Sequence, residues 1–112
     1  INIIELWDNF VGDADLIKMT CQIFLDNYPD PVSAIDVLAN CVDASDLQIK
    51  AHALKGVVAQ FCAEGPTKLL QMLEQYGAEN KLNEVKPLII KVRPLVAELK
   101  TEIDRLLAVL ST

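Results

Sequence analysis

The side chains that could carry chemistry are a single histidine and a lysine that follows it by three residues. His52 is the only histidine among 112 residues, and Lys55 lies about one helical turn further on. An imidazole is nucleophilic near neutral pH, and a lysine within reach of the same point can neutralise the oxygens of a phosphate group. The pair could therefore accept an anionic group on His52 and steady it with Lys55.

The three cysteines offer a second kind of chemistry, but their spacing does not support it. Cys21, Cys41 and Cys62 are odd in number, lie about twenty residues apart and include no CxxC pair. A zinc site formed by these cysteines and His52 is possible in principle, although the spacing gives it no support. We expect reduced, small apolar side chains and no metal site.

His52 belongs to a segment, Leu47 to Ala63, whose apolar residues predict one amphipathic helix. At about 100° of rotation per residue, Leu47, Leu54 and Val58 point in one direction, which we interpret as the core. His52 then lies about 160° away and faces solvent. The uncharged residues on the outward face and its flanks, which we interpret as a surface for a partner protein, are Gln48, Ile49, Gly56, Ala59, Gln60 and Ala63.

Two further features of this segment favour an approaching partner. Gly56 stands in mid-helix, where glycine costs roughly 1 kcal/mol relative to alanine, and its missing side chain would clear space one turn from His52. Asp46 is the only acidic residue of the helix before Glu64. We therefore expect an anion at His52 to meet little local repulsion.

Apolar residues recur at three- and four-residue steps along the whole chain, which predicts an all-α fold. We expect Ser45 to cap the helix that carries His52, Gly77 to close the next helix, and the last helix to kink near Pro94. Short connections favour antiparallel neighbours, so we predict one domain over residues 1–112, an antiparallel up-down four-helix bundle with a short additional N-terminal helix. The expected segments are a lid helix at about 3–10 and bundle helices at about 13–27, 31–41, 45–62, 66–76 and 83–110.

Composition limits the possible partners. The chain is 52% hydrophobic and has a net charge of −6, which argues against nucleic acid or an anionic membrane surface. No apolar run approaches the roughly 20 residues that span a bilayer, and no secretory signal is evident. We expect a cytoplasmic chain without direct membrane contact, acting as a monomer on a protein or small-molecule partner.

The residues around His52 resemble a known signature. Ala51-His52-Ala53-Leu54-Lys55-Gly56 is similar to the A-H-x-L-K-G motif of histidine-containing phosphotransfer (HPt) domains, and the likeness covers most of the chain. Two positions depart from the family's pattern: Cys62 stands where glycine is common, and Gln60 where a small polar residue or Asn is usual. Flanking positions that also resemble the family are Phe24, Tyr28-Pro29-Asp30, Phe61, Ala63, Leu69 and Leu73-Glu74.

The resemblance implies a phosphocarrier rather than an enzyme. His52 would accept a phosphoryl group from the aspartate of one receiver (response-regulator) domain and pass it to another, Lys55 would steady it, and Gly56 would leave room for the receiver. The domain would have no catalytic apparatus or cofactor of its own, because the receiver brings Mg²⁺. Its partners would be receivers and an upstream hybrid histidine kinase, and the chain could be the cytoplasmic domain of a membrane-bound sensor kinase.

Two other functions remain open at the level of sequence. A non-catalytic helical adaptor could bind a partner protein on the same small-residue face, with His52 incidental to binding. A small enzyme would need a cluster of titratable groups in a pocket, and no spacing of the acidic residues indicates one. Phosphorylation of His52 separates the phosphocarrier from both.

Overall fold

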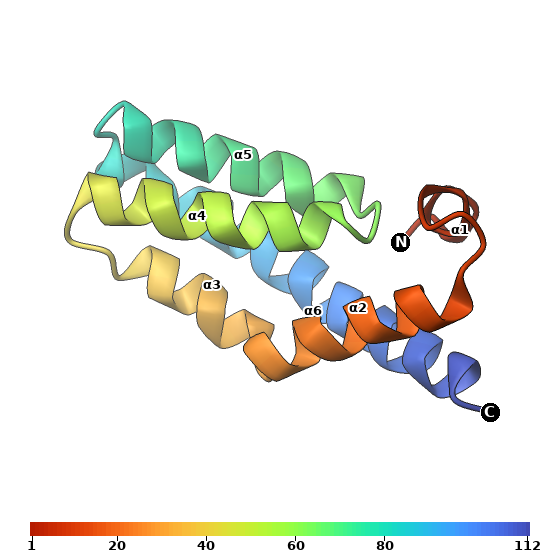
Figure 1. The fold of residues 1–112 in the computed structure, drawn as a ribbon. Coiled ribbons are helices and arrows are strands. Elements are labelled where there is room, and N and C mark those ends of the chain that lie inside the picture. Colours follow the sequence, from red (N-terminus) through yellow and green to blue (C-terminus); the bar gives the residue numbers. More distant parts are fainter.

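The chain folds entirely into helices, which confirms the all-α class predicted from its apolar spacing (Figure 1). The computed structural model describes all residues from 1 to 112 and contains no strand. Its elements are α1 (Ile3–Asn9), α2 (Ala14–Asn27), α3 (Pro31–Ala39), α4 (Ala44–Ala59), α5 (Glu64–Ala78), the short 3-10 helix η1 (Leu82–Glu84) and α6 (Val85–Leu110).

Aspartate side chains begin three of the helices. Asp13 caps α2 by accepting a hydrogen bond from the backbone N–H of Leu16 at 3.0 Å, and Asp30 caps α3 just before Pro31. In α4 the cap is Asp43, whose carboxylate accepts from the N–H of Ser45 at 2.9 Å. The prediction of Ser45 as this cap was wrong, because an extended Asp43 caps as well as serine does and lets the helix begin two residues earlier.

Three helices are followed by residues in the left-handed conformation. Val11, Cys62 and Asn80 have φ of 55°, 55° and 56° and follow α1, α4 and α5. A left-handed residue ends the helix because it turns the chain away from the axis. Helix α4 therefore stops at Ala59 rather than at Cys62.

Helix α5 differs from its expected bounds at both ends. It begins at Glu64, so that Pro66 lies in the first turn, where its missing N–H leaves no helical bond unmade. The prediction that Gly77 closes the helix was wrong: Gly77 lies inside α5, and Asn80 is the left-handed residue beyond the end. Asparagine adopts this conformation more readily than most side chains, because it can bond locally to the backbone.

The long helices run alternately in opposite directions (Figure 1). Helix α4 and α5 lie side by side as an antiparallel hairpin, and α6 returns along the molecule and packs against α2, α3 and α5. Helices α2 and α3 follow one another along one side, with a break at Tyr28 to Asp30. Helix α1 lies at the end of the molecule that holds the N-terminus.

The core is a single cluster of 21 buried apolar residues from all six α-helices and the loop between α4 and α5. Phe24 of α2 and Phe61 in the α4–α5 loop meet edge to face with ring centroids 5.4 Å apart, and Leu6 anchors α1 at 1% exposure. Gly77 sets the closest approach of α5 to α4, because a Cβ there would lie 2.7 Å from the backbone N of Gln48. The α4–α5 hairpin is therefore held in one register.

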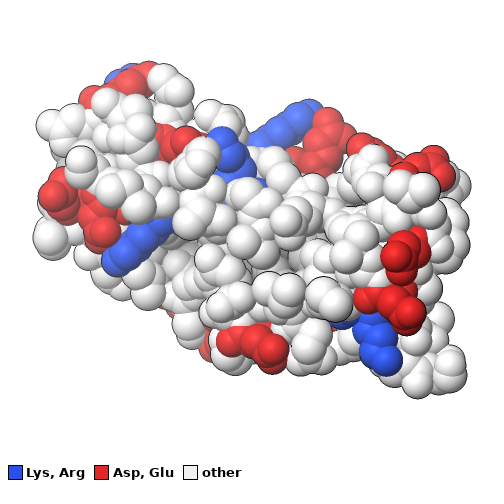
Figure 2. All heavy atoms as spheres, viewed as in Figure 1, with Lys and Arg blue, Asp and Glu red and all other residues white.

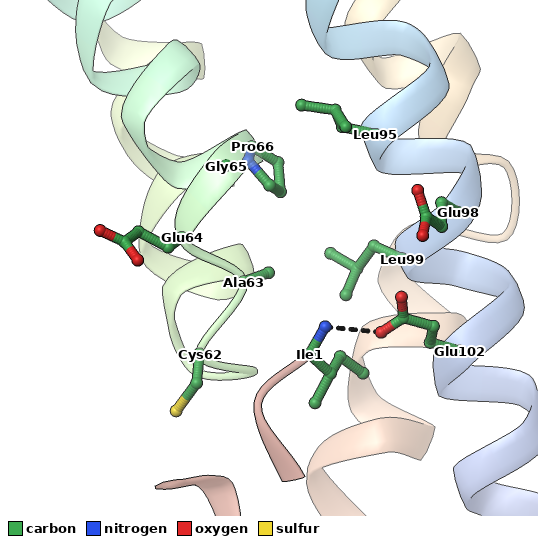
Figure 3. A pocket seen from close by; sticks show the side chains of 10 residues that line it. All are labelled: Ile1, Cys62, Ala63, Glu64, Gly65, Pro66, Leu95, Glu98, Leu99 and Glu102. Atoms are coloured by element: carbon green, nitrogen blue, oxygen red, sulfur yellow. Dashed lines mark hydrogen bonds and ion pairs between the residues drawn. The ribbon is translucent and has the colours of Figure 1, made fainter.

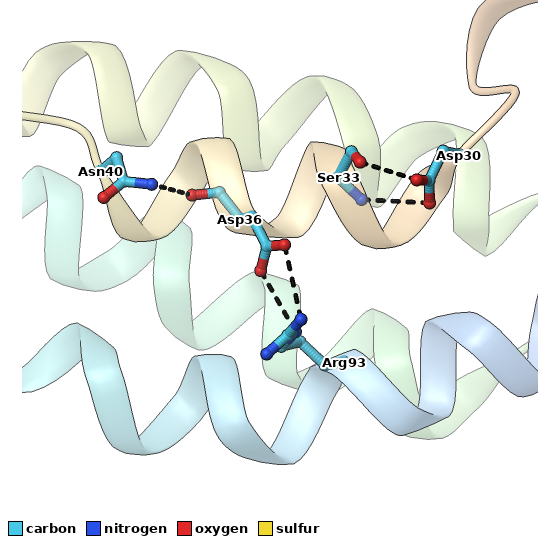
Figure 4. A network of polar contacts seen from close by, with 5 residues as sticks. All are labelled: Asp30, Ser33, Asp36, Asn40 and Arg93. Atoms are coloured by element: carbon cyan, nitrogen blue, oxygen red, sulfur yellow. Dashed lines mark hydrogen bonds and ion pairs between the residues drawn. The ribbon is translucent and has the colours of Figure 1, made fainter.

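Helix α3 is fixed to α6 by an ion pair as well as by apolar contacts (Figure 4). Asp36 accepts from Arg93, with Nε 3.1 Å from Oδ1 and Nη2 3.5 Å from Oδ2. Helix α6 continues through Pro94, the residue after this arginine, and the kink expected there stays a prediction. No helix combines the length and the apolar character needed to cross a lipid bilayer.

Candidate functional site

His52 projects from the middle of α4 with 66% of its side chain exposed. Ala51 and Leu54 belong to the same turn of α4 and point into the core, where they are 0% and 2% exposed. Helical rotation then turns position 52 away from the core, as the spacing of the apolar residues predicts. The imidazole is accessible to another protein or to a small phosphate donor.

Glu74 of α5 contacts the imidazole from the neighbouring helix. Nδ1 of His52 and Oε1 of Glu74 lie 2.8 Å apart, and Nε2 makes no hydrogen bond. An ionised carboxylate only accepts hydrogen bonds, so the proton of the neutral ring must be on Nδ1. The lone pair of Nε2 is then free to act as a nucleophile.

Lys55 holds the same carboxylate from its other side. Its Nζ lies 2.6 Å from Oε2 of Glu74 and donates to Oε1 of Gln71 at 2.7 Å. Oε2 is fully buried, and its contact with Lys55 is an ion pair at close range rather than a well-directed hydrogen bond. Glu74 therefore bridges the histidine and the lysine, and Lys55 supplies the only compensation for its buried oxygen.

Glu74 stays ionised at neutral pH although its side chain is largely buried. Lys55, and to a smaller extent His52, hold the pKa of its carboxyl below the usual value against the opposing effect of desolvation. The carboxylate lies next to the phosphoacceptor candidate, which corrects the expectation that an anion at His52 meets little local repulsion. Only α4 is poor in acidic residues here, and α5 contributes the negative charge.

Five of the six residues predicted for a docking surface on the outward face of α4 are at least partly exposed. Ile49 is 67% exposed, Gly56, Ala59 and Gln60 are exposed, and Gln48 is half-buried. A Cβ placed on Gly56 would meet no atom within 4 Å. Figure 2 shows the side of the molecule that carries α4, and its centre is largely free of charged side chains.

Ala63 does not belong to this surface. It is only 6% exposed and lies beyond the end of α4, where it begins α5. Its assignment to the outward face assumed that the helix continues past Cys62, whereas α4 ends at Ala59 and the chain turns inward. The predicted docking surface therefore keeps Gln48, Ile49, His52, Gly56, Ala59 and Gln60, all of which are at least partly exposed.

Sequence reasoning missed the direct part that Glu74 and Gln71 play at the site. The resemblance to the family included Leu73-Glu74 only as an apolar and acidic pair, and Gln71 was not singled out. The two residues are three apart on α5, so they share a face of that helix and meet Lys55 together. The three-residue spacing could be read from the sequence. The register between α4 and α5, which brings these residues to Lys55, could not.

The cysteines lie apart from this site as unpaired thiols. All three are free, and burial raises the pKa of the Cys21 thiol to about 11. Burial also raises the pKa of Cys41 and of Cys62, so none is an activated nucleophile. No group of three or more His, Cys, Asp or Glu side chains is placed to hold a metal ion.

A separate hollow of about 200 Å³ lies between the start of α5 and α6 (Figure 3). Three glutamates line it, Glu64, Glu98 and Glu102, and Glu102 accepts from the amino group of Ile1 at 2.6 Å. Neither His52 nor Lys55 contributes to its lining. We therefore assign the candidate site to the cluster formed by the exposed His52 with Lys55, Gln71 and Glu74.

Comparison of the chain with protein-family models, with curated proteins and with solved structures finds no match.

Proposed function

We propose that the chain is a histidine phosphotransfer module that accepts a phosphoryl group on Nε2 of His52 and passes it on. The observation that carries the proposal is the hydrogen bond between Nδ1 of His52 and Glu74, which leaves Nε2 free on an exposed imidazole. A nucleophile in this state, on a helix face whose other exposed residues are Ile49, Gly56, Ala59 and Gln60, suits a partner that docks and brings the phosphoryl group. The signature around His52 in the sequence supports the same function.

We also propose that the helices form the architecture of this class of domain. Helices α2 and α3 together, α4, α5 and α6 would be the four members of an antiparallel up-down bundle, and α1 would be the additional N-terminal helix. The alternating directions of α4, α5 and α6 support this arrangement (Figure 1). In such a bundle the phosphoacceptor is on a rigid helix, which suits a reaction that depends mostly on positioning.

The transfer step needs little from the chain itself. The lone pair of Nε2 attacks phosphorus, the bond from phosphorus to the aspartyl oxygen of a receiver breaks, and the electron pair stays with the aspartate. The receiver supplies Mg²⁺, which neutralises the phosphate oxygens during transfer. Lys55 follows His52 by about one helical turn and pairs with the same Glu74, so it is the cation that would balance the charge of the bound phosphoryl group.

The proposed partners follow from this step. Receiver domains would dock on the surface around Gly56, and an upstream hybrid histidine kinase would feed the first of them. The chain would act as a cytoplasmic monomer and as a phosphocarrier rather than an enzyme. An encounter of this transient kind buries on the order of 800 Å² per partner or less.

A helical adaptor is the second candidate, and one observation favours it. Ile49 is 67% exposed on the docking surface, where an apolar side chain gains from contact with a partner whether or not His52 is phosphorylated. In an adaptor the binding of the partner would survive replacement of the histidine. In a phosphocarrier, replacement of the histidine would abolish phosphoryl transfer.

In the experiment, receiver domains from the source organism are phosphorylated with acetyl phosphate in the presence of Mg²⁺ and are then mixed with the chain. We expect an acid-labile, alkali-stable phosphate on the chain and none on His52→Gln, with circular dichroism showing that the variant folds. Equal labelling of the variant, or no labelling by any receiver, would contradict the proposal. Binding of a receiver by both proteins without labelling of either would favour the adaptor.

A further inference from the structure

Helix α6 carries an uncharged face that no other part of the chain covers. Its residues recur at alternating steps of three and four, and all of them are exposed. Ile90 is the only large apolar side chain among them, and it is 72% exposed. At about 1.5 Å per residue the face runs for about 21 Å along the helix. Its residues, which we name the α6 seam, are Pro87, Ile90, Pro94, Ala97 and Thr101.

The spacing of the α6 seam is that of the contact positions in a pair of helices. Residues that alternate at steps of three and four lie on one side of a helix and meet a second helix packed lengthwise. The opposite side of α6 is buried in the core, where Val92 and Val96 are 0% exposed, so the seam faces away from the bundle. Its proline rings and short side chains have low relief, so a second helix can approach closely and cover Ile90.

The residues that flank the α6 seam are mostly basic, although the chain has a net charge of −6. In a pair of helices, residues at these flanking positions face the partner and select the charges that it must carry. Lys86 and Lys91 occupy the flanking positions on the two sides of Ile90. The flanking residues, in order along the helix, are Lys86, Lys91, Arg93, Glu98, Lys100 and Arg105.

Positive charge is left unbalanced in the first half of α6. Residues 85–97 include no Asp or Glu. Arg93 is paired with Asp36 of α3 at 3.1 Å, whereas Lys86 and Lys91 are exposed and form no ion pair. We propose that the α6 seam binds an acidic amphipathic helix of another protein, which covers Ile90 with an apolar side chain and places carboxylates against the two lysines.

A helix fits this face better than an anionic membrane surface does. A short helix meets only the basic half of α6, whereas a bilayer surface would extend along it to the carboxylates of Glu98 and Asp104. A chain with a net charge of −6 is also repelled by such a surface as a whole. Ile90 is the only large apolar side chain that the seam could insert into lipid.

Occupation of the α6 seam would leave His52 accessible. Helices α4 and α6 bury residues in the same core, and Figure 1 shows α6 behind α4. Their outward faces therefore point to different sides of the molecule. A partner on α6 would hold the chain without covering the candidate site, and the inference does not depend on the phosphotransfer function proposed above.

The test uses two synthetic helical peptides of about three heptads, labelled with fluorescein. The acidic peptide has alanine and one central leucine at the contact positions and glutamate at the flanking ones, and the basic peptide has lysine in place of each glutamate. We expect the acidic peptide to bind, to shift the backbone NMR signals of residues 85–101, and to bind more weakly as salt is raised. Ile90→Ala should weaken binding about tenfold and Lys91→Glu about fivefold, as measured by fluorescence anisotropy.

Ile23→Ala and Lys18→Glu are the matched controls. Ile23 is 54% exposed on α2, and Lys18 is an exposed lysine of the same helix that forms no ion pair. Both variants should bind the acidic peptide as the parent does. No binding, equal binding of the two peptides, or equal losses in the controls would overturn the inference. Binding of phosphatidylserine-containing vesicles that Ile90→Ala abolishes would also overturn it, because the face would then meet a membrane.

Discussion

Nδ1 of His52 and Oε1 of Glu74 lie 2.8 Å apart, although 22 residues and a helix hairpin separate them in the chain. The contact joins the exposed face of α4 to α5, and Lys55 closes it from the other side. The candidate site is therefore a property of the hairpin as a whole. The chemistry involves Oε1 of Glu74, which contacts the imidazole, whereas stability depends on Oε2, which is buried against Lys55. The two can therefore be tested separately.

The charge on Glu74 should make stability depend on pH. Lys55 and, less strongly, His52 lower its folded-state pKa, so the pairing stabilises the chain above the unfolded value of about 4.3 and is lost as pH falls through the folded value. We expect Glu74→Gln to unfold more easily by about 1 kcal/mol at neutral pH. The difference should shrink below about pH 4, as measured by urea unfolding at several pH values. A difference that is unchanged in acid would show that Glu74 acts through packing alone.

Replacement of Lys55 should reveal its structural role beside the proposed chemical one. Lys55→Met leaves the buried Oε2 of Glu74 without a partner, which should lower the free energy of unfolding by about 1–3 kcal/mol. Lys55→Gln keeps a hydrogen-bond donor and should therefore lose less stability. Both should slow phosphotransfer. Lys68→Met is the control, because its pair with Glu64 is exposed and should contribute little. Equal melting of Lys55→Met and the parent would remove the structural role.

Cys62 is strained, and glycine should relieve it. Its φ of 55° is the left-handed region, where a side chain costs roughly 1–2 kcal/mol. We expect Cys62→Gly to raise the free energy of unfolding by about 0.5–1 kcal/mol after the greater freedom of unfolded glycine is counted. The only hydrogen bond lost is the 3.4 Å contact from Asn9.

Cys62→Ala is the matched control for this substitution, since it removes the thiol and keeps the Cβ. It should show no gain. If alanine stabilises the chain as much as glycine does, the thiol rather than the backbone is responsible. Val11→Gly offers a second example, because Val11 has the same φ and is 91% exposed, so it loses almost no packing.

Much of this fold follows from short-range rules in the sequence. Helical rotation places His52 outward, and aspartates and prolines begin the helices, because these effects act within one turn. The position of Glu74 does not follow from such rules. It depends on how far α5 is shifted along α4, which is set by contacts between residues distant in sequence. The misplacement of Ala63 has a related cause: a helical projection holds only while the helix continues, and α4 ends at Ala59.

Among the helical glycines, Gly77 should be the least tolerant of substitution. An alanine Cβ there would lie 2.7 Å from the backbone N of Gln48 and 2.9 Å from the carbonyl oxygen of Ala44. Backbone atoms cannot move aside singly, so α5 must shift, and we expect a loss of about 1–3 kcal/mol despite the better helix propensity of alanine. The nitrogen NMR signals of His52 should change as well, because its contact with Glu74 depends on the same register. Gly65→Ala is the control, with only a side-chain atom of Leu95 at 3.5 Å.

Gly56 should behave in the opposite way to Gly77. No atom lies within 4 Å of a Cβ built on it, so Gly56→Ala should stabilise α4 by up to about 1 kcal/mol. Gly56→Gln should fold and melt near the parent, because its side chain extends into solvent. If the missing side chain lets a receiver reach His52, the glutamine variant should accept phosphate from the small donor phosphoramidate at the parent rate. From a phosphorylated receiver it should accept phosphate at least tenfold more slowly than the parent, which corresponds to an activation barrier higher by about 1.4 kcal/mol. Equal rates from both donors would show that Gly56 provides no clearance, and slower loading from phosphoramidate would place its effect on the imidazole rather than on docking.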